Sequence, residues 1–187
     1  MKFMENFIKL MLAFGIGLLL VLLAMPKVIP FLHKMKFGQV EREEGFVSHK
    51  KKGGTPTMGG VVFVLAAVIA AFVVNYKNIT NPNLILITIV LVGYSLIGFI
   101  DDALIILKHQ NEGLKAWQKF LMQAILAVGC YLYLENFVPG FTTEVTIPIV
   151  KVNIDFGWFY AVLVFIMFTG ESNGVNLSDG LDGLATG

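Results

Sequence analysis

The sequence predicts an all-α polytopic membrane protein, and its composition and its apolar runs are the observations that predict it. Hydrophobic residues make up 56% of the 187 residues and charged residues only 14%, and the mean hydropathy is +0.76. Such values are typical of an integral membrane protein rather than of a soluble domain. Five apolar runs are also long enough to cross a bilayer, which takes about 17–25 helical residues. We therefore expect residues 1–187 to form a single integral membrane domain with five transmembrane helices.

The five expected spans lie between polar or glycine-rich segments. They cover residues 7–25, 58–74, 82–100, 114–134 and 156–175. The first run follows Lys2 and Lys9, as the apolar core of a signal peptide would. However, no clean small-x-small cleavage site follows it and four more runs do, so we interpret it as a retained helix.

One segment between the fourth and fifth spans has the pattern of strands. In Thr142–Asp155 apolar residues alternate with polar ones on both sides of Pro148. This alternation predicts two short strands joined at the proline. We expect a small β-hairpin on the outer face of the membrane, with an architectural role.

The distribution of lysine and arginine predicts the orientation, because short cytoplasmic loops carry an excess of both. The loop over residues 26–56 carries seven, and the segment over residues 103–119 carries Lys108, Lys115 and Lys119. The alternate connections carry only Lys77 and Lys151. The N-terminus is therefore expected outside, with both basic loops and the end of the chain in the cytoplasm.

Charge and cysteine content exclude other classes of partner and site. The net charge is +1, and no basic stripe suggests a nucleic-acid partner. Cys130 is the single cysteine and lies within an apolar run. It excludes an intramolecular disulfide and a cysteine-based metal site, and core packing is its expected role.

The first motif with chemical potential is Lys50–Gly60, which ends where the second span begins. It reads K-K-K-G-G-T-P-T-M-G-G. Backbone N–H groups of a glycine-rich turn that opens a helix form an anion site, and neighbouring lysines add positive charge. The alternative is a positively charged anchor with a flexible connection.

The second motif is the pair Asp101-Asp102, which we place at the cytoplasmic end of the third span. Carboxylates are unfavourable at a helix C-terminus, where the helix dipole is already negative. They require a metal, a lysine or a cationic ligand, unless they form a solvated helix end. Two carboxylates are also what Mg²⁺ commonly uses together with substrate phosphates.

The third motif closes the sequence and consists of polar side chains at a strict spacing of three: Asn173, Asn176, Asp179 and Asp182. Polar groups at the membrane edge often mark a site. On a continuous helix nine residues turn the last member about 180° from the first, and the interspersed glycines disfavour a helix. We expect a glycine-broken segment that turns all four towards one ligand. The alternative is an ordinary loop.

Lys119 lies about a turn inside the fourth span. A lysine in this position either extends to the membrane surface or pairs with a phosphate, and the sequence favours neither.

Together these motifs resemble a known family. The run Gly54–Gly60, the pair Asp101-Asp102 and the closing run Asn173–Ala185 resemble those of the phospho-N-acetylmuramoyl-pentapeptide transferases. These enzymes are polyprenyl-phosphate N-acetylhexosamine-1-phosphate transferases of the bacterial inner membrane. Members have ten spans and about twice this length, with a further catalytic aspartate in the second half. The resemblance implies that the chain is the N-terminal half and is inactive alone.

The resemblance also implies a reaction and a set of roles. The reaction transfers phospho-N-acetylmuramoyl-pentapeptide from UDP to undecaprenyl phosphate, which gives lipid I and UMP, and it uses Mg²⁺. Asp101 and Asp102 would be the catalytic pair and metal ligands, although the main metal ligand would lie in the second half. The expected substrate-binding residues are Lys52, Thr57, Lys119, Asn173, Asn176, Asp179 and Asp182. The implied partners are the two substrates, membrane lipids and a second copy in a homodimer.

Two other functions stay open on the residues alone. The spacing Asp179-x-x-Asp182 also suits an intramembrane Mg²⁺-dependent prenyltransferase, which would release pyrophosphate. The third reading is an ion-coupled transporter, but its acids would lie at mid-span rather than at helix ends.

Overall fold

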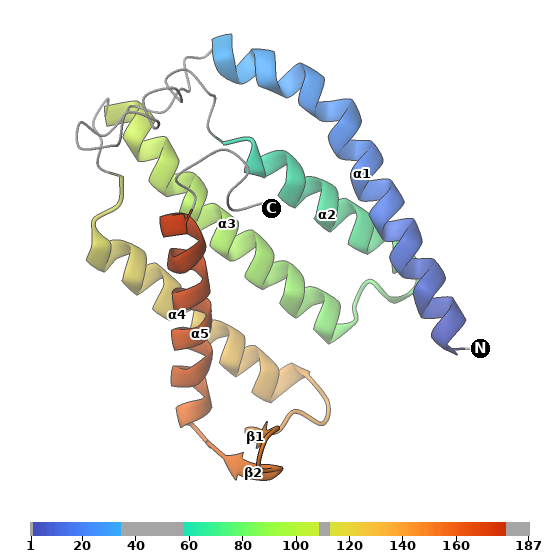
Figure 1. Cartoon of the computed structure of the whole chain (residues 1–187), viewed down its shortest axis with the longest axis vertical. Helices are drawn as coiled ribbons and strands as arrows, with labels where there is room; N and C mark the ends of the chain where they lie inside the picture. Colours follow the sequence, from blue (N-terminus) through green and yellow to red (C-terminus); the bar gives the residue numbers. More distant parts are fainter. Residues whose placement is uncertain (1, 35–57, 109–112, 179–187) are drawn as a thin grey trace. The chain divides into compact units, whose positions relative to one another are not determined.

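The computed structural model describes residues 2–34, 58–108 and 113–178, and in this part of the chain it is helical with one small sheet (Figure 1). The chain divides into two compact units, Met1–Leu114 and Lys115–Gly187. Each of the five predicted spans coincides with a helix, and a two-stranded hairpin follows the fourth. The predicted fold class is confirmed. The single-domain organisation stays a prediction.

Three of the helices are long and apolar enough to cross a membrane. They are α1 (Lys2–Lys34), of which Phe3–Lys34 is the candidate span, α3 (Pro82–Lys108) and α4 (Ala116–Phe137). The helices α2 (Gly60–Val74) and α5 (Phe159–Ser178) have shorter apolar runs. Large apolar side chains lie exposed along them, for example Phe14, Leu22 and Leu23. Such exposure suits a lipid environment, in which apolar surface needs no burial and backbone groups pair within the helix.

Helix α1 (Lys2–Lys34) continues well beyond the predicted end at residue 25. A proline inside a helix removes a backbone hydrogen bond and clashes with the preceding turn. The structure keeps both Pro26 and Pro30 inside the helix. Prolines are tolerated in membrane helices where local adjustments restore the backbone pairing. The helix is therefore longer than the predicted span, whose boundary at residue 25 stays a prediction.

Small residues bring α1 and α2 together. Ala66 and Ala70 of α2 are buried, and a Cβ added to Gly17 of α1 would lie 3.9 Å from the Cβ of Ala70. Near the other end of the pair, Gly59 lies close to the side chain of Met25. Small residues allow membrane helices to approach closely, because packing rather than the hydrophobic effect drives their association.

The turn between α2 and α3 has well-defined caps. A short 3₁₀ helix, Tyr76–Asn78, follows α2. The side-chain oxygen of Asn81 then accepts hydrogen bonds from the backbone N–H groups of Asn83 (2.9 Å) and Leu84 (3.3 Å). Asparagine at the N-cap with proline as the first helical residue is the preferred start of a helix. It fixes the beginning of α3 at Pro82.

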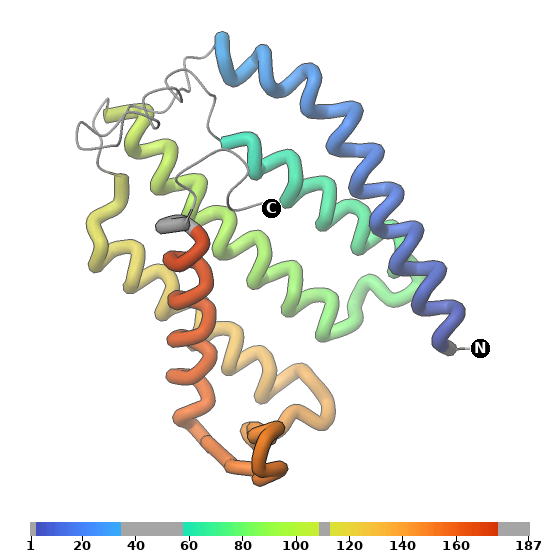
Figure 2. Tube along the Cα trace, in the orientation of Figure 1, coloured from blue at the N-terminus to red at the C-terminus, as the bar shows by residue number. Residues whose placement is uncertain are grey.

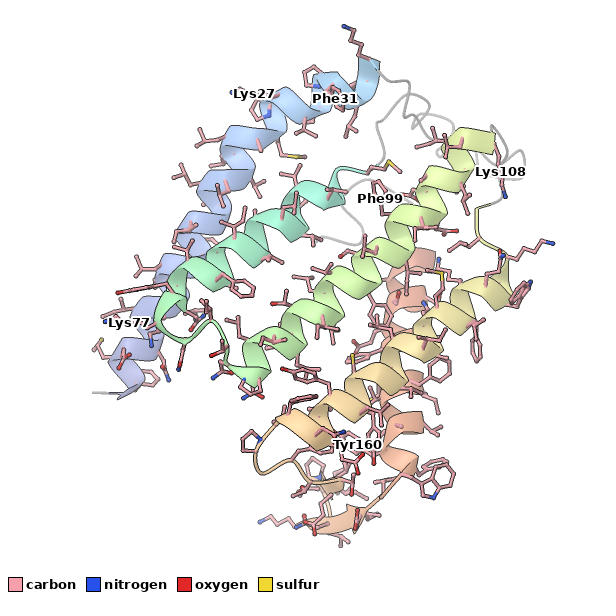
Figure 3. The ribbon with its side chains drawn as sticks, turned by 180° about the vertical axis from the view of Figure 1, so that it is seen from behind. Lys27, Phe31, Lys77, Phe99, Lys108 and Tyr160 are labelled. Atoms are coloured by element: carbon pink, nitrogen blue, oxygen red, sulfur yellow. The ribbon has the colours of Figure 1, made fainter. Side chains whose placement is uncertain are left out.

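Within the first unit the three helices run up, down and up. Figure 3 places Lys27 and Lys108 towards one end of the unit and Lys77 at the other end. The end of α1, the start of α2 and the end of α3 therefore share one end. This arrangement brings the first residues of the second span to the same end as the acidic pair of α3.

The second unit consists of α4, the hairpin and α5, and the chain path through it can be followed in Figure 2. Strands β1 (Glu144–Ile147) and β2 (Val152–Asp155) pair antiparallel, with Glu144 opposite Asp155 and Ile147 opposite Val152. The predicted hairpin around Pro148 is confirmed. Its turn includes Lys151 with φ of +51°, a left-handed conformation that is uncommon outside glycine.

Aromatic side chains join the base of the hairpin to both helices of the unit. Phe141 lies edge-on to Tyr160 of α5 and to Tyr131 of α4, with ring centroids 5.4 and 6.3 Å apart. Such edge-to-face pairs are favourable beyond the area they bury. Further along α4, Ala127 and Cys130 are buried, so Cys130 has the packing role predicted for it.

Candidate functional site

The acidic pair lies inside α3 rather than at its end. Asp101 and Asp102 are half-buried, and the helix continues to Lys108. The residues after the pair, Ala103–Leu107, are apolar and contain no glycine or proline, so nothing in them ends the helix. The argument from a helix C-terminus was therefore wrong, while the predicted span boundary at residue 100 stays a prediction.

The carboxylate of Asp101 is held by the chain that follows α3. The backbone N–H of Leu114 donates a hydrogen bond of 2.7 Å to Asp101 Oδ1. A hydrogen bond from a backbone N–H to an ionised carboxylate is short and strong. It fixes the orientation of the side chain, because the donor belongs to the main chain and cannot rotate away as a side-chain donor would.

Gly113 makes this contact possible. A Cβ added to Gly113 would collide with Asp101 Oδ1 and would lie 2.7 Å from the Asp101 carbonyl oxygen and 3.0 Å from its Cγ. Only glycine allows the backbone to approach so closely. The role of Gly113 could not be predicted from the sequence, because it depends on a contact with a residue twelve positions earlier in the chain.

In the second unit the structure links Asn173 of α5 to α4. Asn173 Nδ2 donates to the backbone oxygen of Thr169 (2.9 Å) and to the side-chain oxygen of Gln123 on α4 (3.4 Å). Lys119 is half-buried on α4, four residues before Gln123 and thus on the same face of the helix. Lys119 and Asn173 therefore belong to the same end of the α4–α5 pair.

The start of the closing motif is helical, contrary to the expectation of a glycine-broken segment. Helix α5 runs through Gly170, Asn173, Gly174 and Asn176 to Ser178. Two glycines cost a helix about 2 kcal/mol relative to alanine, and the surrounding apolar helix tolerates this. Asp179 and Asp182 lie outside the described residues, and so do the side chain of Asn176 and the residues Lys52 and Thr57.

Met58, the first described residue of the glycine-rich motif, precedes α2 with φ of +69°. A non-glycine residue with positive φ is uncommon and frequently lies at a functional site. Helix α2 then begins at Gly60, as the motif predicted.

Comparisons with known proteins identify the family. A model described as glycosyl transferase family 4 matches residues 84–187, more than half of the chain. The chain belongs to this family. In addition, residues 52–64 match a pattern described as phospho-N-acetylmuramoyl-pentapeptide-transferase signature 1.

Relatives named phospho-N-acetylmuramoyl-pentapeptide-transferase are similar to this chain over nearly its whole length. The protein from Halalkalibacterium halodurans is 44% identical over 179 residues, which are 95% of this chain and 54% of the relative. Those from Bacillus subtilis and Staphylococcus epidermidis are 44% and 45% identical over 91% and 92% of the chain, and 52% and 54% of their own lengths. The chain thus spans about half the length of these relatives. The resemblance found in the sequence is confirmed.

The described residues of this glycosyl transferase family member can be tested for a metal site. Among them no cluster of three or more His, Cys, Asp and Glu side chains is placed to hold a metal ion. Asp101 and Asp102 do provide two carboxylates at adjacent positions. Mg²⁺ is commonly bound by one or two carboxylates with substrate phosphates and water completing its shell. The chemistry of this pair is that of a Mg²⁺ site shared with a phosphate ligand rather than of one enclosed by protein, and the ion itself stays a prediction.

Proposed function

We propose that the full-length gene product containing this chain transfers phospho-N-acetylmuramoyl-pentapeptide from UDP to undecaprenyl phosphate, giving lipid I and UMP. The observation that carries the proposal is the match of residues 52–64 to the signature of transferases with this name. The similarity of the whole chain to such transferases supports it. A polar site bordered by apolar helices also suits a reaction between a lipid phosphate and a water-soluble nucleotide sugar.

The proposed location is the bacterial inner membrane, with the N-terminus outside and the site at the cytoplasmic boundary. In the first unit the end of α1, the start of α2 and the end of α3 share one end, with Lys27 and Lys108 towards it (Figure 3). Such an accumulation of lysines is typical of a cytoplasmic face. Lys77 lies alone at the opposite end.

The roles proposed for the residues follow from their chemistry. Asp101 and Asp102 act at the reacting phosphates and are the proposed ligands of Mg²⁺, which when bound supplies neutralisation of the diphosphate charge. Lys119 binds a phosphate. The nucleotide-sugar contacts are assigned to Lys52, Thr57, Asn173, Asn176, Asp179 and Asp182. The proposed assembly is a homodimer in which undecaprenyl phosphate and membrane lipids contact the apolar helices.

The contact with Leu114 supports a positioning role for Asp101 rather than a role as general base. The second pKa of a phosphate monoester is about 6, so the lipid phosphate is mostly dianionic at neutral pH and needs no base. A carboxylate fixed by a backbone N–H at 2.7 Å instead offers a rigid acceptor for orienting a nucleophile or a metal. A route through an aspartyl-phosphate, in which the carboxylate attacks first, stays an alternative.

An assay of the purified full-length gene product tests the proposal. UDP-N-acetylmuramoyl-pentapeptide and undecaprenyl phosphate are supplied with Mg²⁺ in detergent. We expect release of UMP together with a lipid-linked sugar pyrophosphate. Release of pyrophosphate from a prenyl diphosphate would instead indicate a prenyltransferase. Ion flux into liposomes without UMP release would indicate a transporter, and either result would overturn the proposal.

A further inference from the structure

The side chain of Gln123 is the most buried polar group of the second unit's described residues. It lies within the apolar helix α4 and is 1% exposed. A polar side chain inside a membrane helix is costly to bury, so its presence needs an explanation. Apart from its contact with Asn173, Gln123 plays no part in the function proposed above.

Hydrogen bonding fixes which way the amide of Asn173 points. Its neighbour at 2.9 Å is the backbone oxygen of Thr169, which can only accept. The atom facing Thr169 must therefore be the amide nitrogen, and the same nitrogen faces Gln123. Gln123 must then present its oxygen, since two amide nitrogens facing each other would be two donors.

This arrangement decides which atom of Asn173 is left for a ligand. The amide nitrogen has two hydrogens, and the two contacts inside the helix pair use both. The remaining hydrogen-bonding atom is the carbonyl oxygen Oδ1, which can only accept. Asn173 is thereby set to recognise a hydrogen-bond donor.

Near this contact, α4 and α5 each contain a buried polar atom that has no hydrogen-bond partner among the described residues. Among the residues that the structure describes, neither Gln123 Nε2 nor Thr169 Oγ1 has a hydrogen-bond partner, and both atoms are buried. A buried donor without an acceptor is destabilising, so an apolar side chain of similar size would serve packing as well or better. Within the described residues, packing alone therefore does not account for Gln123.

We propose that Gln123 is a positioning residue that holds Asn173 with its carbonyl oxygen directed to a donor group of the nucleotide substrate, either the imide N–H of the base or a ribose hydroxyl. This inference rests on the proposed function, because it assigns Asn173 to nucleotide recognition. It adds a residue that acts through Asn173 and specifies the acceptor character of the contact.

A double-mutant cycle on the full-length gene product tests the proposal. The dissociation constant of UDP-N-acetylmuramoyl-pentapeptide is measured by titration calorimetry for the wild type, Gln123→Met, Asn173→Ala and the double variant. We expect each single variant to bind about tenfold more weakly, and the double variant to bind no more weakly than Asn173→Ala. Non-additivity is the signature of two residues that act as one unit.

Stability measurements and a matched control separate positioning from a structural role. Gln123→Met is expected to keep the thermal midpoint of the wild type, because it removes a buried unpaired donor. If this variant does not fold, Gln123→Leu takes its place in the double-mutant cycle. Asn136→Leu removes an amide at the other end of α4 that donates only to its own helix, to the Leu132 oxygen at 2.7 Å, and should bind normally.

Two results would overturn the inference, and they differ from failure of the proposed function. One is wild-type affinity in Gln123→Met while Asn173→Ala is weakened; the other is additive losses in the double variant. Analogues then distinguish the donors. If the imide is recognised, Asn173→Ala should bind N3-methyl-UDP as tightly as the wild type does. If the hydroxyl is recognised, the two proteins should instead bind 2′-deoxy-UDP with equal affinity. A wild-type protein that binds none of these nucleotides would refute the proposed function itself, and this inference with it.

Discussion

At the scale of single residues, the contact between Gly113 and Asp101 gives the sharpest expectation. Gly113→Ala in the full-length gene product places a methyl group against the Asp101 carboxylate and its carbonyl oxygen. The carboxylate must move or lose its bond to Leu114, and a displacement of about 1 Å at a reacting group costs on the order of 100-fold in rate. We expect kcat for UMP release to fall at least about tenfold.

The matched control for this substitution is Gly98→Ala. Gly98 lies one turn before Asp101 on the same helix, and a Cβ added there meets no atom within 4 Å. It should keep the wild-type rate. Equal rates for the two alanine variants would show that the approach of Gly113 to Asp101 has no catalytic importance.

Substitution of Asp101 itself separates positioning from proton transfer. The amide oxygen of Asp101→Asn can still accept from Leu114, so the geometry is kept while the negative charge is lost. If Asp101 positions a group, the rate falls but the acid limb of the pH–rate profile stays where it is in the wild type. A shift of that limb, measured by kcat/KM against pH, would instead identify Asp101 as the base.

The sequence alone identified those residues whose polarity differs from that of their neighbours in the chain. Asp101, Asp102 and Asn173 are polar groups at the edges of apolar runs and stand out without a structure. Gln123 and Gly113 do not stand out, because their importance arises from contacts with residues fifty and twelve positions away. Periodicity and local propensity contain no information on such tertiary pairs.

At the scale of elements, the existence of helices was predictable and their ends were not. Length and apolar content identified the five α-helices of the described residues, and alternation identified the hairpin. Helices α1 and α3 extend past the predicted spans, and the start of the closing motif is helical where a glycine-broken segment was expected. Proline and glycine disfavour helices in water, whereas in a membrane the cost of unpaired backbone groups favours a continuous helix.

Hydrogen bonds to Asp155 make the stability of the hairpin depend on pH, and they determine the sign of this dependence. The Thr143 hydroxyl and the Gly157 N–H both donate to Asp155 Oδ1, and they hold the pKa of Asp155 below its ordinary value. The ionised form is favoured in the folded hairpin. Its stabilising contribution is therefore fully present above the unfolded pKa of about 3.9 and is lost as the pH falls through the lower folded pKa.

Thr143→Val tests this account of Asp155. Because it removes the larger of the two contributions, we expect the pKa of Asp155, followed by its carboxyl carbon shift, to rise towards the ordinary value. Thr146→Val is the control, since that hydroxyl donates to Asn153 in the same hairpin at 2.8 Å. A similar rise in both variants would mean that the hairpin as a whole, not the Thr143 bond, lowers the pKa.

At the scale of the whole molecule, the two units of this chain match about half of each relative's length. Each unit brings polar residues to one end: the acidic pair near the end of α3, and Lys119 and Asn173 at one end of the α4–α5 pair. That these sets meet in one site stays a prediction, as does the Mg²⁺ ion. Both depend on long-range assembly, on which motif spacing gives no information.

Labelling of introduced cysteines measures the orientation of the chain in the membrane. Cys130 is the one cysteine of these 187 residues, so Cys130→Ala, together with replacement of any cysteine in the rest of the full-length gene product, provides a cysteine-free background. The positive-inside rule places the Lys27–Lys108 end of the first unit in the cytoplasm. A membrane-impermeant maleimide should therefore label Lys77→Cys and Lys151→Cys in intact cells, but Lys108→Cys only after permeabilisation. The reverse pattern would put the acidic pair on the outer face, where no cytoplasmic nucleotide sugar could reach it.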